Sequence, residues 1–366
     1  MAEADIKPSV LILGGCGFVG RSIAMYLLEE KLANKVCIVD KLAPVLFRLT
    51  EKEQELFTKI EFRSGNLSKP EVADKCFEGS WDIVVNAAAE TRYAQSDAVY
   101  KERISTLGVI CARTAVNHGC KRFIQFSSAR VYKSSRNPNK ENSELKPTTT
   151  MHNEYLLLEQ EIAKIEGLNY IIIRTADIYG PGMNNSSPML PRIVVGAIYK
   201  YIGESMMLLW SKSLEMNVVH ITDVCRATWL LTSKGESGDV YNLADKGSTT
   251  QGSLCEVLSA YFGIKYSFIG SLVTHAVGVE DAKEYSNEKH VAPWTALCAL
   301  EGINTSITPY LNEELLTDYE VCVNGSKIEA LGFQYIVPEF NLDRLKEVVD
   351  DLVARQQFPK HIPSKS

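Results

Sequence analysis

The sequence predicts an α/β protein built on a doubly wound parallel sheet. Short apolar strands alternate with segments of helical periodicity through the first half of the chain. Small or polar residues follow these strands at their carboxyl ends. Such ends meet at one edge of a parallel sheet, so we expect one shared ligand site there.

The first unit is "SVLILGGCGFVGRSIAMYLLEE", a strand, a glycine turn and an amphipathic helix. Gly14, Gly17 and Gly20 form a G-x-x-G-x-x-G pattern that encloses Phe18 and Val19. A turn without side chains lets a pyrophosphate approach the backbone at the helix N-terminus. The pattern predicts a dinucleotide site, whereas glycines alone would indicate only a turn.

The second strand, "KVCIVD", ends in Asp40, twenty residues after Gly20. A carboxylate there accepts both ribose hydroxyls of an adenosine and repels a 2′-phosphate. NAD is therefore favoured over NADP, although Lys41 follows directly and Arg48 is near in sequence. The plain alternative, a solvated acid at a strand end, is weaker beside the glycines.

Three further strands end in candidate ligand residues. "KIEFRSGNL" ends in Asn66 and Leu67, and "WDIVVNAAAE" contains Ala87, Ala88 and Ala89, whose small side chains let a flat cofactor lie against the backbone. "KRFIQFSS" ends in Ser128.

The chain resembles the extended short-chain dehydrogenase/reductase superfamily, in its NAD-dependent epimerase/dehydratase branch. The motifs that carry the resemblance follow the family order over nearly the whole chain; they are "GGCGFVG", the strand-end Asp40, "GNL", "NAAA", "FSSARVY", "RTADIYGPG", "NVVHITDV", "GDVYNLAD" and "NGSKIEALGF". The resemblance implies NAD as cofactor, with Thr175 among its binding residues.

The resemblance also implies the domain organisation, a Rossmann domain with a smaller, interleaved C-terminal substrate domain. Residues 1–180 form an NAD-binding Rossmann domain, to which a segment at about 217–246 returns. Residues 181–216 and 247–340 form the substrate-binding domain, and residues 341–366 a C-terminal helix and tail. A homodimer is expected, formed by helices 96–118 and 151–166 as a four-helix bundle.

The family's reactive centre is altered. Its enzymes carry a Y-x-x-x-K pair on one helix face and a Ser or Thr that polarises the substrate oxygen, here Ser128. Relatives have an acid four residues after the lysine, and Glu159 in that place aligns Met151 with the tyrosine and Tyr155 with the lysine. A shifted register makes Tyr155 the tyrosine and puts Glu159 at the lysine. In the first register a thioether transfers no proton. In the second a carboxylate would raise the pKa of the tyrosine rather than lower it. Neither register gives a Tyr-Lys pair.

Other positions depart from the family pattern. Ser105 replaces an Asn, Asn66 an Asp, and Asp177 the Asn of "RxxNVYGP", where a carboxylate would repel a phosphorylated ligand. We assign Glu90, Tyr132 and Asp177 to the substrate pocket. Five residues are candidate acid/base groups, and each also has a purely structural interpretation: Tyr132, His152, Tyr155, Glu90 and Asp177. Of these, Tyr155 is the preferred candidate for a remaining catalytic role.

Bulk properties narrow the class of protein. A net charge of −6 argues against a nucleic-acid or anionic membrane partner. Nine cysteines without a C-x-x-C pair or a metal-ligand cluster indicate thiols of a reducing compartment. Because no metal-ligand cluster is present, we expect no bound metal. No signal peptide and no membrane span are recognised, so we expect a cytoplasmic protein.

Two functions stay open from the sequence. The first is an NAD-dependent oxidoreductase or epimerase/dehydratase that acts on a secondary alcohol or ketone, a nucleotide sugar or a sterol-like compound, with a non-standard proton donor. The second is an NAD-binding pseudoenzyme that serves as a redox sensor or as a protein-interaction or structural subunit. A binder needs the glycines and Asp40 but not a tyrosinate.

Overall fold

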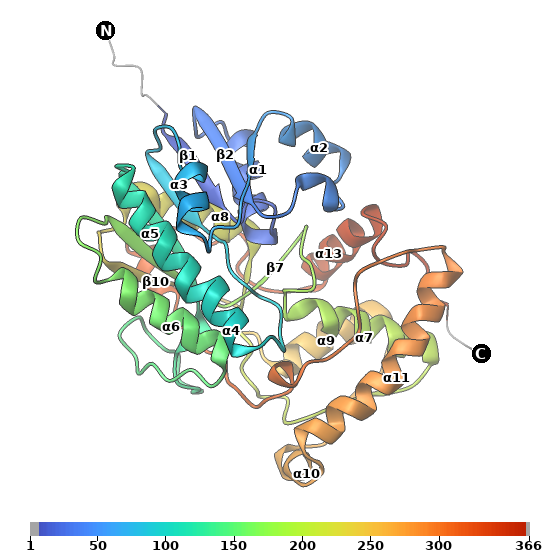
Figure 1. Cartoon of the computed structure of the whole chain (residues 1–366). Helices are drawn as coiled ribbons and strands as arrows, with labels where there is room; N and C mark the ends of the chain where they lie inside the picture. Colours follow the sequence, from blue (N-terminus) through green and yellow to red (C-terminus); the bar gives the residue numbers. More distant parts are fainter. Residues whose placement is uncertain (1–6, 364–366) are drawn as a thin grey trace.

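The computed structural model describes residues 7–363, which form two lobes with the sheet in the larger one (Figure 1). The sheet has seven strands in the order β10-β6-β5-β4-β1-β2-β3, and every pair is parallel. This is the predicted doubly wound arrangement, in which the order reverses beside β1. The strands are β1 (Ser9–Leu13), β2 (Lys35–Asp40), β3 (Glu61–Ser64), β4 (Ile83–Asn86), β5 (Arg122–Ser128), β6 (Tyr170–Thr175) and β10 (Asp239–Leu243).

Helices cover both faces of this sheet because successive residues of a strand point to opposite sides. In β1, Val10 and Ile12 join one buried cluster, and Leu11 and Leu13 join the other. The first cluster includes α1 (Phe18–Glu29) and α8 (Ile221–Lys234), and the second includes α3 (Pro70–Cys76), α5 (Leu107–Asn117) and α6 (Thr150–Ile162). In Figure 1, α5 and α6 lie side by side on the near face.

The smaller lobe is mostly helical. It contains α7 (Met189–Ile202), α9 (Gln251–Phe262), α10 (Ser271–Val277), α11 (Val279–Leu300), α13 (Leu342–Ala354) and the strand pair β8 (Met206–Leu208) with β11 (Tyr266–Phe268). A second parallel pair, β7 (Asp177–Tyr179) with β9 (Val218–His220), lies where the chain leaves and re-enters the larger lobe. The short elements are η1 (Pro44–Leu46), α2 (Glu51–Phe57), η3 (Ala129–Val131), η4 (Glu313–Leu315) and α12 (Ser326–Glu329).

The two helices expected at 96–118 and 151–166 differ in detail from the prediction. The first consists of α4 (Asp97–Tyr100), a π-helical segment at Lys101–Thr106, and α5. The second, α6, begins after Thr149, whose side chain accepts from the backbone N–H of His152, and ends at Ile162. Periodicity alone does not reveal a π-helical turn, since it shifts the helix face by a single residue.

Buried ion pairs connect the lobes beside the glycine turn. Arg21 on α1 contacts Glu53, which in turn binds Arg355 near the end of α13. Arg21 also donates to the carbonyl of Gly182 at 2.9 Å, and the Gly182 N–H donates to Asp351 at 2.7 Å. The N-terminal half of α1 is thereby fixed against the second lobe.

All nine cysteines are free thiols, and eight of them are buried. Within residues 7–363, no helix combines the length and the apolar composition that crossing a membrane requires.

Candidate functional site

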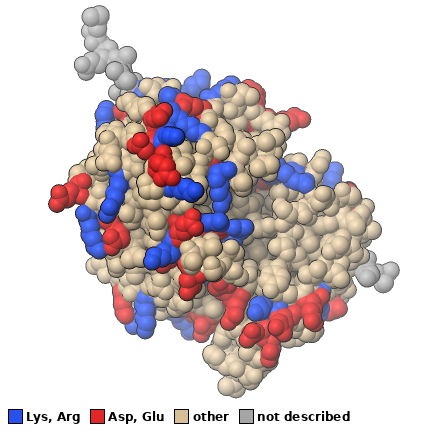
Figure 2. Space-filling view, in the orientation of Figure 1, with Lys and Arg blue, Asp and Glu red and all other residues tan. Residues whose placement is uncertain are grey.

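A cavity of about 930 Å³ lies across the carboxyl ends of the strands, between the two lobes. Figure 2 shows the hollow between the lobes with basic side chains along its edge. All twelve predicted cofactor residues line it: Gly14, Gly17, Phe18, Val19, Gly20, Asp40, Asn66, Leu67, Ala87, Ala88, Ala89 and Thr175.

Two positions of the glycine turn, Gly14 and Gly20, leave no room for a side chain. Gly14 has a φ of +73°, and a Cβ there would lie 2.7 Å from the Cα of Ala88. A Cβ on Gly20 would lie 2.3 Å from the carbonyl oxygen of Gly14. Gly17, the N-cap of α1, offers no capping side chain, so the first N–H groups of the helix face the cavity end of the turn. These are the features of a pyrophosphate cradle.

The strand ends complete this half of the cavity. Asp40 accepts from the backbone N–H groups of Cys16 and Leu42, both at 3.1 Å, which fixes its carboxylate at the end of β2. The side-chain oxygen of Asn66 accepts from the N–H and the hydroxyl of Ser68. The residues present therefore fit NAD: the turn at Gly14–Gly20 would hold the pyrophosphate, and Asp40 the adenosine ribose.

Helix α6 presents Met151 and Tyr155 to the cavity, one turn apart on the same face. Glu159, a further turn along, does not line the cavity; it is buried and forms an ion pair with Arg174 of β6. The register that places Met151 and Tyr155 at the reacting positions thus agrees with the geometry. In the shifted register, the second reacting position falls behind the cavity wall.

The ionisable groups next to Met151 do not titrate near neutral pH. Burial, assisted by the Glu90 carboxylate, raises the pKa of Tyr155 well above its usual range. Burial and then Arg130 lower the pKa of His152 to about 3, and the His152 ring Nδ1 lies 2.6 Å from the Thr149 hydroxyl. Tyr155 therefore stays a phenol and His152 a neutral imidazole.

Ser128 lines the cavity at the end of β5, where its hydroxyl oxygen accepts from the N–H of Arg130 at 3.1 Å. Arg130 forms an ion pair with Asp177 at 2.9 Å, and both line the cavity. Burial alone would lower the pKa of Arg130, but Asp177 outweighs it and raises that pKa. Because Arg130 balances the Asp177 charge, the expected repulsion of a phosphorylated ligand by Asp177 does not hold.

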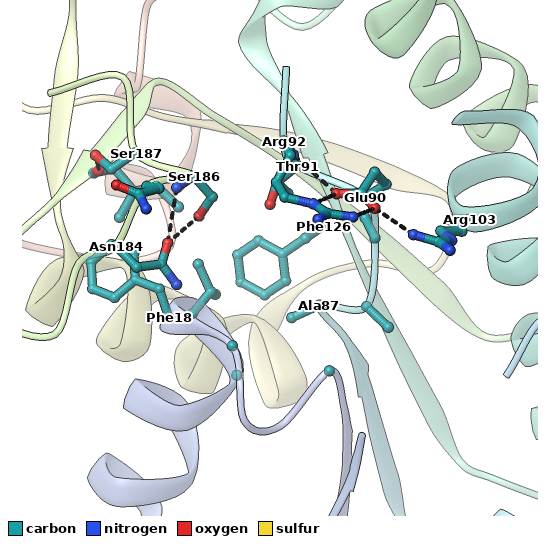
Figure 3. A pocket seen from close by; sticks show the side chains of 18 of the residues that line it. Phe18, Ala87, Glu90, Thr91, Arg92, Arg103, Phe126, Asn184, Ser186 and Ser187 are labelled. Carbon is teal, nitrogen blue, oxygen red and sulfur yellow. Dashed lines mark hydrogen bonds and ion pairs between the residues drawn. The ribbon is translucent and has the colours of Figure 1, made fainter. Parts of the chain in front are cut away.

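Glu90 forms the centre of a charged cluster on the cavity wall (Figure 3). Arg92 binds both of its carboxylate oxygens at 2.9 Å, and Arg103 binds one of them at 2.8 Å. Burial would raise the pKa of Glu90, but the hydrogen bonds from Arg92 and Arg103 outweigh it and lower the pKa to about 2. Glu90 is thus a fixed anion rather than a proton carrier.

Tyr132 does not lie in the pocket to which we assigned it. It is 1% exposed and does not line the cavity. Its hydroxyl donates to the side-chain oxygen of Asn242 and accepts from Arg174, both at 2.8 Å. Tyr132 therefore belongs to the buried network behind β5 and β6, which also contains Glu159.

Several lining residues were missed in the sequence. Arg92 and Arg103 line the cavity around Glu90, and Phe126 lies between this cluster and Phe18 (Figure 3). Arg130 is a third cation in the lining. The second lobe supplies the polar segments 184–187 and 304–306. In the described part of the chain, no group of three His, Cys, Asp or Glu side chains is placed to hold a metal ion.

Comparison with known proteins decides the family. The model of the NAD dependent epimerase/dehydratase family matches residues 10–244. The chain belongs to this family. Membership confirms the resemblance, the fold class and the cofactor, NAD, that the sequence predicted.

Similar curated proteins are sugar-nucleotide enzymes by name. A dTDP-D-glucose 4,6-dehydratase of Dictyostelium discoideum is 29% identical over 266 residues, which cover 64% of this chain and 57% of that enzyme. A trifunctional UDP-glucose 4,6-dehydratase, epimerase and reductase of Arabidopsis thaliana is 25% identical over 263 residues, which cover 67% of this chain and 38% of that enzyme. The aligned part thus spans about half or less of these relatives.

A solved dTDP-glucose 4,6-dehydratase of Streptomyces venezuelae, a double mutant with NAD bound, superimposes with a TM-score of 0.68 at 20% identity. The match covers 94% of this chain and 96% of that one. At this identity, the likeness supports the fold.

Proposed function

We propose that this protein binds NAD and a nucleotide sugar in the cleft between its lobes, and that it lacks the Tyr-Lys proton relay of its family. It acts as an NAD-dependent binding protein, a pseudoenzyme that responds to the cofactor or to the sugar nucleotide. One observation carries the proposal: α6 presents a thioether and a protonated phenol, Met151 and Tyr155, to the cavity.

The dinucleotide half of the cavity supports the proposed binding of NAD. The turn at Gly14–Gly20 and the open start of α1 suit a pyrophosphate, and Asp40 suits a free ribose. Ala87 and Ala88, at the end of β4, leave space for the nicotinamide side. When bound, NAD can accept a hydride from an alcohol carbon, but the alcohol proton needs a base of this chain.

The reacting half supports the absence of a proton relay. Glu90, His152 and Tyr155 do not suit a base at neutral pH, and Asp177 is engaged by Arg130 in an ion pair. Glu90 and His152 have pKa values of about 2 and 3, and the pKa of Tyr155 is raised. General acid/base catalysis is most efficient when the pKa lies near the working pH, and it contributes a factor of about 10²–10⁴. Without it, the bound alcohol is oriented but keeps its proton.

A second candidate function is an oxidoreductase that acts on a secondary alcohol or ketone, a nucleotide sugar or a sterol-like compound. Ser128 favours it, because its hydroxyl lies at the cavity wall beside α6, where it can hydrogen-bond a substrate oxygen. Water or Tyr155 would then have to carry the proton.

The test combines binding and turnover. Purified protein is titrated with NAD by calorimetry and then, in its NAD-loaded form, with UDP- and dTDP-sugars, while absorbance of the reduced nicotinamide is followed. The proposal predicts heat of binding for NAD and for a sugar nucleotide without growth of that absorbance. Turnover that Ser128→Ala abolishes would establish the second candidate instead.

The homodimer through helices 96–118 and 151–166 and the cytoplasmic location stay predictions. Leu157 on α6 is 39% exposed, and we expect it to face the partner helices in the proposed bundle. Sedimentation of the wild type beside Leu157→Glu tests the dimer, since a charge at a helix-bundle interface favours the monomer.

A further inference from the structure

We propose that the cavity contains an anion subsite, formed by Arg92 and Arg103 around the buried Glu90, and that it binds the carboxylate of an acidic sugar. The inference deepens the proposed function and rests on it: the ligand class becomes a nucleotide sugar whose sugar ring carries a carboxylate. Neither family membership nor the named relatives assign these residues.

The cluster is a built site rather than a pair of surface arginines. Glu90 is 5% exposed and binds Arg92 through two parallel N–H···O bonds and Arg103 through a third. The paired bonds fix the guanidinium plane of Arg92 before a ligand arrives, and the single bond holds Arg103 beside the same carboxylate. Two cations around one carboxylate leave a net charge of +1 on this wall.

The arginines keep donors for a ligand. A guanidinium has five N–H donors. The side-chain bonds to Glu90 occupy two donors of Arg92 and one of Arg103, whose side chains are 61% and 36% exposed and line the cavity. A carboxylate that approaches from the cavity can bridge the two guanidinium groups opposite Glu90.

The backbone gives a second, independent indication. Arg103 lies in the π-helical segment Lys101–Thr106, and its carbonyl accepts from the N–H of Glu90 at 3.3 Å. π-Helical turns are rare and occur frequently at functional sites. Arg103 and Glu90 are therefore connected both by a main-chain hydrogen bond and by their side-chain ion pair.

The charge of the whole cavity fits an anionic ligand. Its lining contains five Lys or Arg residues and three Asp or Glu residues, although the chain has a net charge of −6. The cations are Lys41, Arg48, Arg92, Arg103 and Arg130, and the acids are Asp40, Glu90 and Asp177. A positive cavity in an acidic protein concentrates anions at that site.

The position of the cluster favours the sugar over the phosphates of the ligand. Glu90 directly follows Ala87–Ala89 and contributes to the raised pKa of Tyr155, so the cluster lies at the reacting end of the cavity. Across the cavity, Asn184, Ser186 and Ser187 form a polar wall suited to sugar hydroxyls (Figure 3). A carboxylate on the sugar ring would meet the arginines there.

The test compares UDP-glucuronate with UDP-glucose on the NAD-loaded protein by calorimetry. The two probes share the diphosphate and differ by one carboxylate. We expect UDP-glucuronate to bind about tenfold more tightly, as for one hydrogen-bonded charge pair. Arg103→Gln should remove this preference, whereas Arg113→Gln, an exposed arginine on α5 outside the cavity, should leave it unchanged.

NAD affinity serves as the folding control, because Glu90 keeps Arg92 as its partner in Arg103→Gln. Equal affinity for the two probes, or an equal loss for both in Arg103→Gln, would overturn the carboxylate subsite and leave the proposed function intact. Binding of NAD with neither probe would overturn the ligand class itself and the subsite with it.

Discussion

The two halves of the cavity are lined by different kinds of residue. The dinucleotide half consists of glycines, alanines and backbone N–H groups around one carboxylate, Asp40. The reacting half consists of arginines and carboxylates in fixed pairs, with Met151 and Tyr155 at the helix that should carry the chemistry. The pyrophosphate cradle depends on positions without side chains, whereas catalysis in the reacting half depends on particular side chains. Catalytic residues can therefore be substituted while the cofactor site stays intact.

The largest effect we expect is on stability, from the buried pair behind the reacting half. Glu159→Ala leaves Arg174 charged and buried, which should cost about 3–5 kcal/mol of unfolding free energy. Urea unfolding monitored by circular dichroism measures it. Glu161→Ala on the same helix removes a solvent-exposed pair with Lys164 and should cost at most about 0.5 kcal/mol. Equal losses would show that Glu159 does not anchor α6.

The next effect is on NAD binding, from the middle glycine. A Cβ on Gly17 has only the Gly14 carbonyl oxygen near it, at 3.3 Å, and no positive φ is needed, so Gly17→Val should fold. Its side chain would occupy the pyrophosphate cradle and weaken NAD binding by about a hundredfold or more. Calorimetry gives the affinity, and Ser22→Ala, one turn along α1, is the control. Unchanged affinity in Gly17→Val would place the cofactor elsewhere.

A smaller effect separates NAD from NADP. Asp40→Asn keeps the shape of the side chain but removes the charge that binds the ribose and repels a 2′-phosphate. We expect NAD to bind about tenfold more weakly. The ratio of NADP to NAD affinity should rise, which fluorescence titration of the reduced cofactors measures. An unchanged ratio would mean that Asp40 only caps the turn through Cys16 and Leu42.

The smallest effect we expect is that of pH on the affinity for the sugar ligand, which should stay nearly constant. The carboxyl of Glu90 has a lowered pKa of about 2, so its ionised form, and the stability it adds, persists at neutral pH and is lost only as the pH falls from about 4 toward 2. His152, with a pKa of about 3, stays neutral above that range. The affinity of the sugar ligand should therefore vary less than twofold between about pH 5.5 and 8.5. A step near pH 6.5 would identify a titrating imidazole in the site.

The residues assigned to the dinucleotide half lie together along one cavity, as expected, because their sequence signals are local. Gly14, Gly17 and Gly20 act within one turn, and Asp40 or Ala88 follow strands whose ends must meet in a parallel sheet. The order of the motifs therefore sufficed to place them together.

The reacting half was harder to predict because its side chains take their partners from distant segments. Tyr132 follows Ser128 in a recognisable motif, yet Arg174 and Asn242 hold it behind the sheet. Arg92 and Arg103 gain their significance only from Glu90 and the π-helical turn, which apolar periodicity does not show.

The central claim is that the cofactor is held while the proton relay is missing, and restoring the relay tests it most directly. The double variant Met151→Tyr with Tyr155→Lys places a phenol and an ammonium one turn apart on the cavity face of α6. NAD-loaded wild type and variant are mixed with the sugar nucleotide that binds, and reduced-nicotinamide absorbance is recorded in a single turnover. We predict no signal from the wild type and a signal from the variant; a wild-type signal as fast as that of the variant would contradict the account.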